Sequence, residues 1–235
     1  MELSDAGSPE PYPGLRSFRK SESDIFFGRD DHLDEMIVKL SDHYFLCITG
    51  PSGCGKSSLA RTGLMNHLEA GFLASRGSDW IFCDLSPGDH PIDNLFRRLA
   101  AAIAAEVKSD ELAAAGGERS EQIFQLFYTT TQRRTSDLNE VIDLIAGVGG
   151  RPIMILVDQF EELFRYALSD SDAAVNFVEI LKTLGVPREK LWQRVLYFLF
   201  DVIRIPYTQI GYVYDLNHSR WHGPTIGGSS SATIP

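Results

Sequence analysis

The feature that most restricts the fold of this chain is a glycine-rich stretch, GPSGCGKS, at residues 50–57. It follows a short apolar run, HYFLCIT (43–49), of the kind found in strands that are buried on both faces of a parallel sheet. A helical pattern begins directly after it, with Ala60, Leu64 and Leu68 repeating every four residues. A strand, a glycine-rich turn and a helix in this order are the context in which the pattern G-x-x-x-x-G-K-[ST] holds phosphate groups.

Each residue type in this stretch has a physical role in holding phosphate. Glycines let the chain curl so that successive backbone N–H groups point at one phosphate cluster. The helix that follows adds N–H groups without acceptors and the positive end of its dipole. Lys56 is placed to reach the outer phosphates, and the Ser57 hydroxyl can ligate Mg²⁺. The predicted phosphate-binding residues are Gly50, Ser52, Gly53, Cys54, Gly55, Lys56, Ser57 and Ser58.

In a second motif, IMILVDQFEELF at 153–164, an apolar run typical of a buried strand is followed by three carboxylates, Asp158, Glu161 and Glu162. Burying a bare carboxylate is costly unless a partner compensates it. Ligands of open α/β sheets bind at the carboxyl ends of the strands, so Asp158 is expected to face a nucleotide-held Mg²⁺ together with Ser57. Either Glu161 or Glu162 can polarise an attacking water as general base, and we favour Glu161. The other glutamate is expected to be a salt-bridge partner or a carboxylate at a helix N-terminus, and a solvated loop is the alternative for both glutamates.

The remaining sequence alternates strand and helix patterns up to about Pro187. Further strand patterns lie at 80–85 and 151–158, and this order predicts an α/β fold with helices on a parallel sheet. After Pro187 aromatics, prolines and glycines are mixed without sustained periodicity, so no further strand-and-helix unit is placed there. The expected organisation is an extended segment at 1–24, a P-loop NTPase domain at 25–186 and an irregular or poorly ordered tail at 187–235.

Composition excludes several classes of protein. Among the 235 residues, 43% are hydrophobic and 23% charged, as in an ordinary globular protein, and the formal net charge is -10. Nucleic acid is an unlikely partner because phosphate binding by a surface needs clustered Lys and Arg. No apolar run approaches the ~18 residues of a membrane span, and no signal peptide is recognisable. A cytoplasmic location is therefore expected.

Three segments in order resemble the STAND class of signal-transduction ATPases with numerous domains. They are PYPGLRSFRKSESDIFFGRDDHLDEM (11–36), GPSGCGKSS and ILVDQFEELF, and they are most similar to the bacterial branch called novel STAND type 1. The resemblance, which covers about 11–186, implies a three-layer, ASCE or AAA-like P-loop core with a sensor strand between the two Walker strands. It also implies that Phe27, Gly28 and Arg29 line the adenine site. From the residues alone, Phe26 and Phe27 are equally well interpreted as core aromatics.

The resemblance also implies a function. Guanine-reading tetrapeptides of the N-K-x-D or T-K-x-D type are absent, so ATP and ADP with Mg²⁺ are the expected ligands, by elimination. STAND proteins are switches held by ADP and activated by exchange for ATP, with slow hydrolysis, self-association and linked sensor or effector domains. In bacteria they commonly serve signalling or phage defence. Here no effector region precedes residue 11, and after GVPREKLWQRV the sequence departs from the family's sensor strand. We therefore expect a truncated or frameshifted C-terminal part, with hydrolysis in doubt.

Two readings of other classes compete with this one. A small-molecule kinase would share the phosphate loop, with Asp84 as a substrate-binding acid and the Arg133-Arg134 region as a basic lid. A non-catalytic interaction fragment would instead bind a partner through the aromatics of 192–214 and would not be stabilised by nucleotide. A DNA-loading ATPase of the origin-recognition type has a related architecture, but the net charge counts against it.

Overall fold

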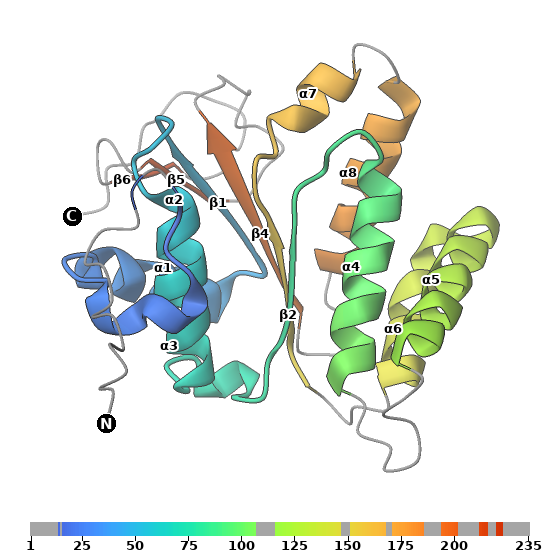
Figure 1. The fold of residues 1–235 in the computed structure, drawn as a ribbon, viewed down its shortest axis with the longest axis horizontal. Coiled ribbons are helices and arrows are strands. Elements are labelled where there is room, and N and C mark those ends of the chain that lie inside the picture. The colour runs from blue at the N-terminus through green and yellow to red at the C-terminus, as the bar shows by residue number, and fades with distance from the viewer. Residues whose placement is uncertain are drawn as a thin grey trace, which may run out of the picture.

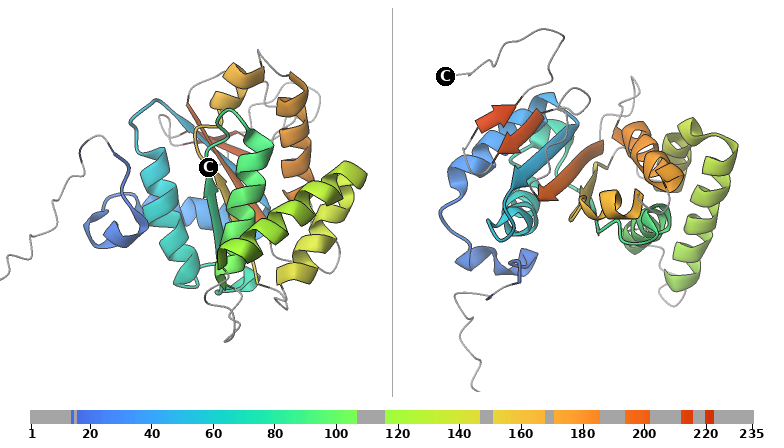
Figure 2. Two further views of the ribbon diagram at one scale, coloured as in Figure 1. Left: turned by 45° about the vertical axis from the view of Figure 1, so that its right-hand side comes forward. Right: turned by 90° about the horizontal axis from the view of Figure 1, so that it is seen from above.

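A computed structural model describes residues 14, 16–106, 116–146, 151–167, 171–185, 194–201, 212–215 and 220–222. Helices cover both faces of a central sheet, which gives three layers, and this α/β architecture is the one expected from the sequence (Figure 1). Figure 2 shows the layers from above, with the sheet between two groups of helices. None of the helices in the described ranges is long and apolar enough to cross a membrane.

The sheet is parallel except at one edge. Its strands are β1 (Phe45–Gly50), β2 (Ile81–Leu85), β3 (Ile153–Val157), β4 (Arg194–Asp201), β5 (Tyr212–Asp215) and β6 (Arg220–His222). They lie in the order β2-β3-β4-β1-β5-β6, and only β6 pairs antiparallel, with β5. The strands that precede the phosphate loop and Asp158, β1 and β3, are therefore separated by β4 alone, which pairs in parallel with both.

One face of the sheet is covered by α1 (Asp30–Asp42) and by the helix that follows the phosphate loop. This helix runs continuously through α2 (Lys56–Ser58), a π-helical stretch η2 (Leu59–Leu64) and α3 (Met65–Glu69), and we call it the P-loop helix. A 3-10 helix, η1 (Lys20–Ile25), packs against it, and another, η3 (Ala74–Arg76), leads toward β2.

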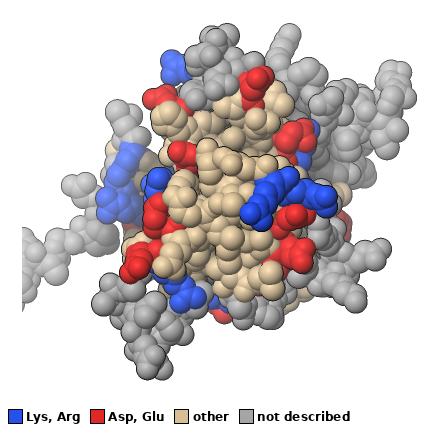
Figure 3. Space-filling model, turned by 90° about the vertical axis from the view of Figure 1, so that its right-hand side faces the viewer, with Lys and Arg blue, Asp and Glu red and all other residues tan. Residues whose placement is uncertain are grey.

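The opposite face is covered by α4 (Pro91–Glu106) and α8 (Ser171–Gly185). Outside them lie α5 (Gly116–Arg133), the 3-10 helix η4 (Thr135–Asp137) and α6 (Leu138–Ala146), while the short α7 (Glu162–Ala167) stands beyond the end of β3 (Figure 1). The face of the molecule formed by α5 and α6 carries interspersed acidic and basic side chains rather than a single basic area (Figure 3).

Alternation along β3 divides the hydrophobic core into two clusters. Ile153, Ile155 and Val157 belong to the cluster under α4 and α8, whereas Met154 and Leu156 belong to the cluster under the P-loop helix. Every residue of β3 is buried, as expected for a strand covered on both faces. Because side chains alternate with period two, Asp158 continues the even-numbered series toward the P-loop helix.

The segment expected to be an irregular tail contains three strands. β4 fills the position between β1 and β3 that the resemblance implied for a sensor strand, a strand that the sequence analysis did not place. Its sequence, RVLYFLFD, has no local signal beyond a short apolar run, and its identity as a strand depends on pairing with β1 and β3, which are distant in sequence. The residues between and after these strands lie outside the described ranges.

The N-terminal segment is also more structured than expected. Residues 1–24 were predicted to lie extended over the surface, yet Lys20 to Ile25 form η1 against the P-loop helix. Three polar side chains spaced four apart on that helix bind the segment. Ser58 Oγ accepts the N–H of Phe18 at 3.0 Å, Thr62 Oγ1 donates to Arg19 O at 3.0 Å, and Asn66 Nδ2 donates to Lys20 O at 2.8 Å. The polar stripe is what docks the segment, because it satisfies backbone groups that a purely apolar helix face would leave unpaired.

Candidate functional site

The phosphate-loop stretch forms a tight turn between the end of β1 and the P-loop helix. Gly53 and Gly55 have φ values of 77° and 94°, in the left-handed region that favours glycine, and a Cβ at either would meet no atom within 4 Å. Lys56 is only 8% exposed, and its Nζ donates to the carbonyls of Gly50 at 2.9 Å and Pro51 at 3.0 Å. The loop thus curls around its own ammonium group.

The two sequence motifs meet at the carboxyl end of β3. Ser57 Oγ donates to Asp158 Oδ1 at 3.0 Å, although 101 positions separate the two residues in the sequence. Asp158 is 8% exposed, and its backbone N–H donates to Leu85 O at 2.8 Å, which holds it at the end of the adjacent strand β2. A hydroxyl and a carboxylate are oxygen ligands of the kind that Mg²⁺ prefers, so this pair fits the expected metal.

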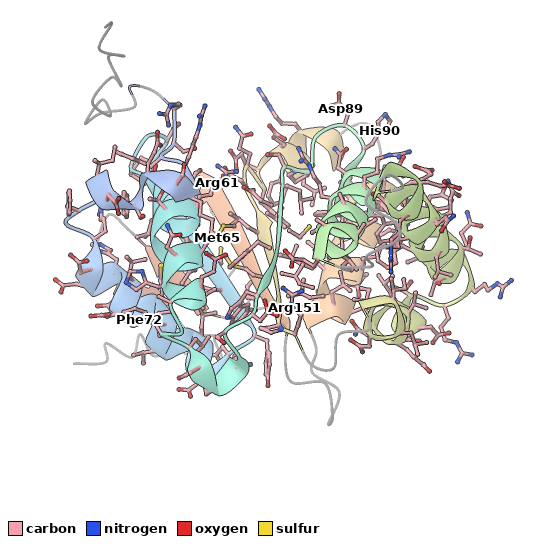
Figure 4. All side chains as sticks on the ribbon, turned by 60° about the horizontal axis from the view of Figure 1, so that its bottom comes forward. Arg61, Met65, Phe72, Asp89, His90 and Arg151 are labelled. Carbon is pink, nitrogen blue, oxygen red and sulfur yellow. The ribbon has the colours of Figure 1, made fainter. Side chains whose placement is uncertain are left out.

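Arg61 was not predicted from the sequence, yet it joins the site to β2. Its Nη1 lies 2.8 Å from Asp158 Oδ2, and its Nε and Nη2 lie 2.6 Å and 2.9 Å from the two carboxylate oxygens of Asp84. The hydrogen bonding that Arg61 donates to the Asp84 carboxylate is the main cause that raises the pKa of Arg61 above its ordinary value. Arg61 lies where the N-terminal segment crosses the P-loop helix, within 3.4 Å of Ser17 Oγ (Figure 4).

Two features of the sequence are consistent with the contact of Arg61 with Asp84 and Asp158. Arg61 follows Ser57 by four residues, so the two share a helix face. Asp84 follows Phe82 by two residues, and Phe82 packs against the core under the P-loop helix. Neither feature alone identifies the contact, because it also depends on how the helix sits on the sheet.

Gln159, directly after Asp158, has an unusual backbone conformation. Its φ is 55°, and it is the one residue other than glycine with positive φ among those that the structure describes. A side chain in this region carries conformational strain, which clusters at functional sites. The turn lets the Gln159 N–H donate to Asp158 Oδ1 at 3.0 Å, so the strained residue contributes a donor to the carboxylate.

The two candidate glutamates have different surroundings. Glu162 begins α7, and its Oε2 accepts the N–H of Gly88 at 3.2 Å, in the loop between β2 and α4. Glu161 is half-buried in the turn before α7, and its backbone carbonyl accepts the N–H of Phe164 at 3.1 Å. Glu162 thus has a structural role at a helix start, one of the alternatives expected for the second glutamate.

The segment proposed to line the adenine site lies beside the phosphate loop. Arg29 Nη2 donates to Cys54 O at 3.2 Å, and Gly28 has a φ of 77°. Phe26 is half-buried and packs on the same core cluster as Cys54, which agrees with its interpretation as a core aromatic. Phe27 is 78% exposed, so that interpretation is wrong for Phe27, and its place at the adenine stays a prediction.

Two further residues predicted to bind phosphate, Ser52 and Ser58, differ in the exposure and hydrogen bonding of their side chains. Ser52 is exposed in the turn. Ser58 is 7% exposed, and its hydroxyl accepts a hydrogen bond from the N-terminal segment. The group of Ser58 that the start of the helix would offer to a phosphate is therefore its backbone N–H.

Known proteins that are similar to this chain include a family of NTPases and a solved structure. The sequence matches the family model described as Novel STAND NTPase 1 over residues 11–199. No curated protein matches the chain. Among solved structures, the fold is similar to the ORC2 protein of Aeropyrum pernix in its ADPNP–ADP complexes, with 11% identity and a TM-score of 0.49. That match covers 81% of this chain and 48% of the other, so the chain spans about half of that protein's length.

The residues that match the family model include the segments that form the site. The match includes the N-terminal segment, the phosphate loop and the Asp158 motif, and it continues to residue 199, within β4, beyond the 11–186 expected from motifs alone. These are the elements that the sheet brings together around Ser57 and Asp158. The chain therefore belongs to the novel STAND NTPase 1 family, whose members are nucleotide-binding NTPases.

Proposed function

We propose that this chain is the nucleotide-dependent switch module of a signalling protein, one that binds ATP and ADP with Mg²⁺ and hydrolyses ATP slowly. The observation that carries the proposal is the 3.0 Å contact between Ser57 and Asp158, which unites a phosphate-loop pattern with a second acidic motif. Membership in a family of nucleotide-binding NTPases supports it. The signalling role, with self-association and further sensor or effector domains, is an expectation drawn from the family resemblance, as are a bacterial source and a cytoplasmic location.

The phosphates would be held by the loop and by the start of the P-loop helix. The first N–H groups of a helix have no acceptors within the helix and attract anions. Lys56 would exchange its contacts with the Gly50 and Pro51 carbonyls for the outer phosphates. Mg²⁺ would supply charge neutralisation at the phosphates, with Ser57 and Asp158 holding it. Among the described residues, no group of three or more His, Cys, Asp or Glu side chains could hold a metal.

Hydrolysis requires a group that takes a proton from the attacking water. We assign this role to Glu161, the residue that the sequence analysis favours, and we assign Glu162, whose carboxylate accepts the N–H of Gly88, to holding the start of α7. Gln159 donates its backbone N–H to Asp158 and thereby keeps that carboxylate in orientation.

The kinase reading loses its two supporting features in the structure. Asp84 is held through both carboxylate oxygens by Arg61, so it is not presented to a substrate. Arg133 and Arg134 stand at and just after the end of α5, which packs outside α4 on the face of the sheet opposite the P-loop helix (Figure 1). They therefore cannot serve as a lid over the phosphate loop without a large rearrangement.

The interaction-fragment reading rested on the aromatics of 192–214. Most of this segment's described residues form β4, which is paired on both sides within the sheet. A central strand is a component of the fold rather than a docking surface.

The proposal is tested by comparing nucleotide affinities and turnover on the full chain. We expect ADP to bind more tightly than ATP, GTP to bind weakly, and ATP turnover to fall far below the typical enzyme value of about 10 s⁻¹. Rapid γ-phosphoryl transfer to an added small-molecule acceptor would contradict the switch and favour a kinase. Absence of binding by any nucleotide would contradict the nucleotide site itself.

The cysteines give an independent reporter of ligand binding. Burial raises the pKa of the Cys47 and Cys83 thiols above their ordinary value, so little thiolate forms at either near pH 8. Cys54 is half-buried in the phosphate loop. We expect iodoacetamide to modify Cys54 first in the native chain and ADP with Mg²⁺ to slow this reaction, as followed by mass spectrometry of peptides. Modification of Cys47 or Cys83 at the same rate, or an unprotected Cys54, would contradict this expectation, and Cys54→Ser is the control.

A further inference from the structure

We propose that Arg61 is an internal counter-ion of Asp158 that Mg²⁺ must displace, and that Asp84 receives Arg61 when it is displaced. Under this proposal the pair of Arg61 and Asp84 sets how much Mg²⁺ the site requires. The inference rests on the proposed function, because it concerns the same Ser57–Asp158 pair. It adds two residues that neither motif contains.

The position of Asp158 makes competition unavoidable. Its Oδ1 accepts hydrogen bonds from Ser57 Oγ and from the Gln159 N–H, both at 3.0 Å, while its Oδ2 lies 2.8 Å from Arg61 Nη1. Both carboxylate oxygens are thus engaged. Oδ1 has two donors and Oδ2 has one, so a cation would approach Asp158 at Oδ2, where it meets the positive charge of Arg61.

Asp84 lowers the free-energy cost of displacing Arg61 from Asp158. The Arg61 guanidinium uses Nε and Nη2 for Asp84 and only Nη1 for Asp158, so its contact with Asp84 is the bidentate one. When Nη1 leaves Asp158, the guanidinium keeps a charged partner. Without Asp84 a largely buried cation, 24% exposed at its side chain, would lose its last carboxylate, which is costly.

The fold holds the three groups in place. Asp84 is the second-last residue of β2 and Asp158 follows β3, two strands that pair directly in parallel, with Asp84 opposite Leu156. Arg61 lies on the P-loop helix one turn beyond Ser57, within the π-helical stretch η2. π-Helical turns are rare and occur frequently at functional sites.

Two substitutions should change the Mg²⁺ requirement in opposite directions. Arg61→Met removes the competing cation, so half-saturation of ADP binding should need about fivefold less Mg²⁺. Asp84→Asn keeps the shape of the side chain but removes the charge that receives Arg61. Half-saturation of ADP binding in this variant should therefore need about fivefold more Mg²⁺. Arg61→Lys retains the charge without the bidentate geometry. Its Mg²⁺ requirement should therefore lie between those of Arg61→Met and the unmodified chain.

The experiment measures ADP affinity by calorimetry on the full chain while Mg²⁺ is varied, with EDTA as the zero point. The control is Arg97→Met, because Arg97 also pairs with a carboxylate, Glu121 at 3.1 Å, but on the opposite face of the sheet. A second readout is the melting temperature with Mg²⁺ and no nucleotide. Arg61→Met should gain stabilisation by Mg²⁺ that the unmodified chain lacks, since two carboxylates are then left without their cation.

The outcomes separate this inference from the proposed function. Opposite shifts for Arg61→Met and Asp84→Asn, with Arg97→Met unchanged, support it. Equal Mg²⁺ requirements in all variants, or shifts in the same direction, overturn it and leave Arg61 a structural link. If no nucleotide binds at all, the proposed function fails, and the nucleotide-free melting data still decide whether Mg²⁺ and Arg61 compete. If Arg61→Met does not fold, Arg61→Lys and Asp84→Asn decide by the same criterion.

Discussion

Replacing Phe127 with alanine is expected to lower the free energy of unfolding by about 3–5 kcal/mol, which is a large share of the stability of a typical domain. Phe127 lies on α5 with no exposed surface, and its ring is 5.8 Å from that of Phe96 on α4. The loss combines the transfer free energy of the ring with a cavity that the surrounding helices fill only partly. Urea denaturation at 25 °C measures it from the shift of the transition midpoint.

The adjacent residue provides the control for this prediction. Tyr128 is 42% exposed on the same helix, so Tyr128→Ala should change the free energy of unfolding by about 0.5 kcal/mol or little more. Equal losses at the two positions would show that α5 is not packed on α4 through the face containing Phe127. Nucleotide affinity should be unchanged in both variants under conditions where they are folded, because α5 lies on the face opposite the P-loop helix.

Glu161→Gln is expected to reduce ATP turnover by about 10²- to 10⁴-fold while nucleotide affinity changes only a few-fold. The substitution removes the basic oxygen but keeps the size of the side chain. Turnover measured by phosphate release, together with ADP affinity by calorimetry, separates a catalytic loss from a binding loss.

The matched control is Glu162→Gln. Its amide oxygen can still accept the N–H of Gly88, which Glu162 binds at 3.2 Å, so α7 should remain in place and turnover should fall much less. A larger loss in Glu162→Gln than in Glu161→Gln would reverse the assignment of the base. Unchanged turnover in both variants would mean that neither carboxylate takes the proton.

The phosphate loop and Asp158 could be placed from the sequence because their signals are local. A glycine pattern between a strand and a helix specifies its own backbone, and an apolar run that ends in Asp158 specifies the end of a buried strand. The parallel sheet rule then brings the two ends to one edge. The observed contact of Ser57 with Asp158 is what this rule predicts.

The parts that escaped prediction depend on contacts between distant segments. β4 has a short apolar run that only its pairing with β1 and β3 turns into a central strand. The bidentate contact of Arg61 with Asp84 depends on the position of a helix over a sheet edge, which periodicity does not encode. Phe26 and Phe27 are chemically identical neighbours, and only the packing of Phe26 against the core under the P-loop helix tells the core aromatic from the exposed one.

The central claim, a nucleotide site built on Lys56, is tested most directly by calorimetric titration of the full chain with ADP in the presence of Mg²⁺. We predict one site per chain and a loss of about ten- to a hundredfold in affinity for Lys56→Ala, since charge-assisted hydrogen bonds contribute about 1.5–3 kcal/mol. Lys182→Ala, at an exposed ion pair on α8, should bind ADP as the unmodified chain does. No heat of binding, or equal affinity with and without the Lys56 ammonium, would contradict the claim.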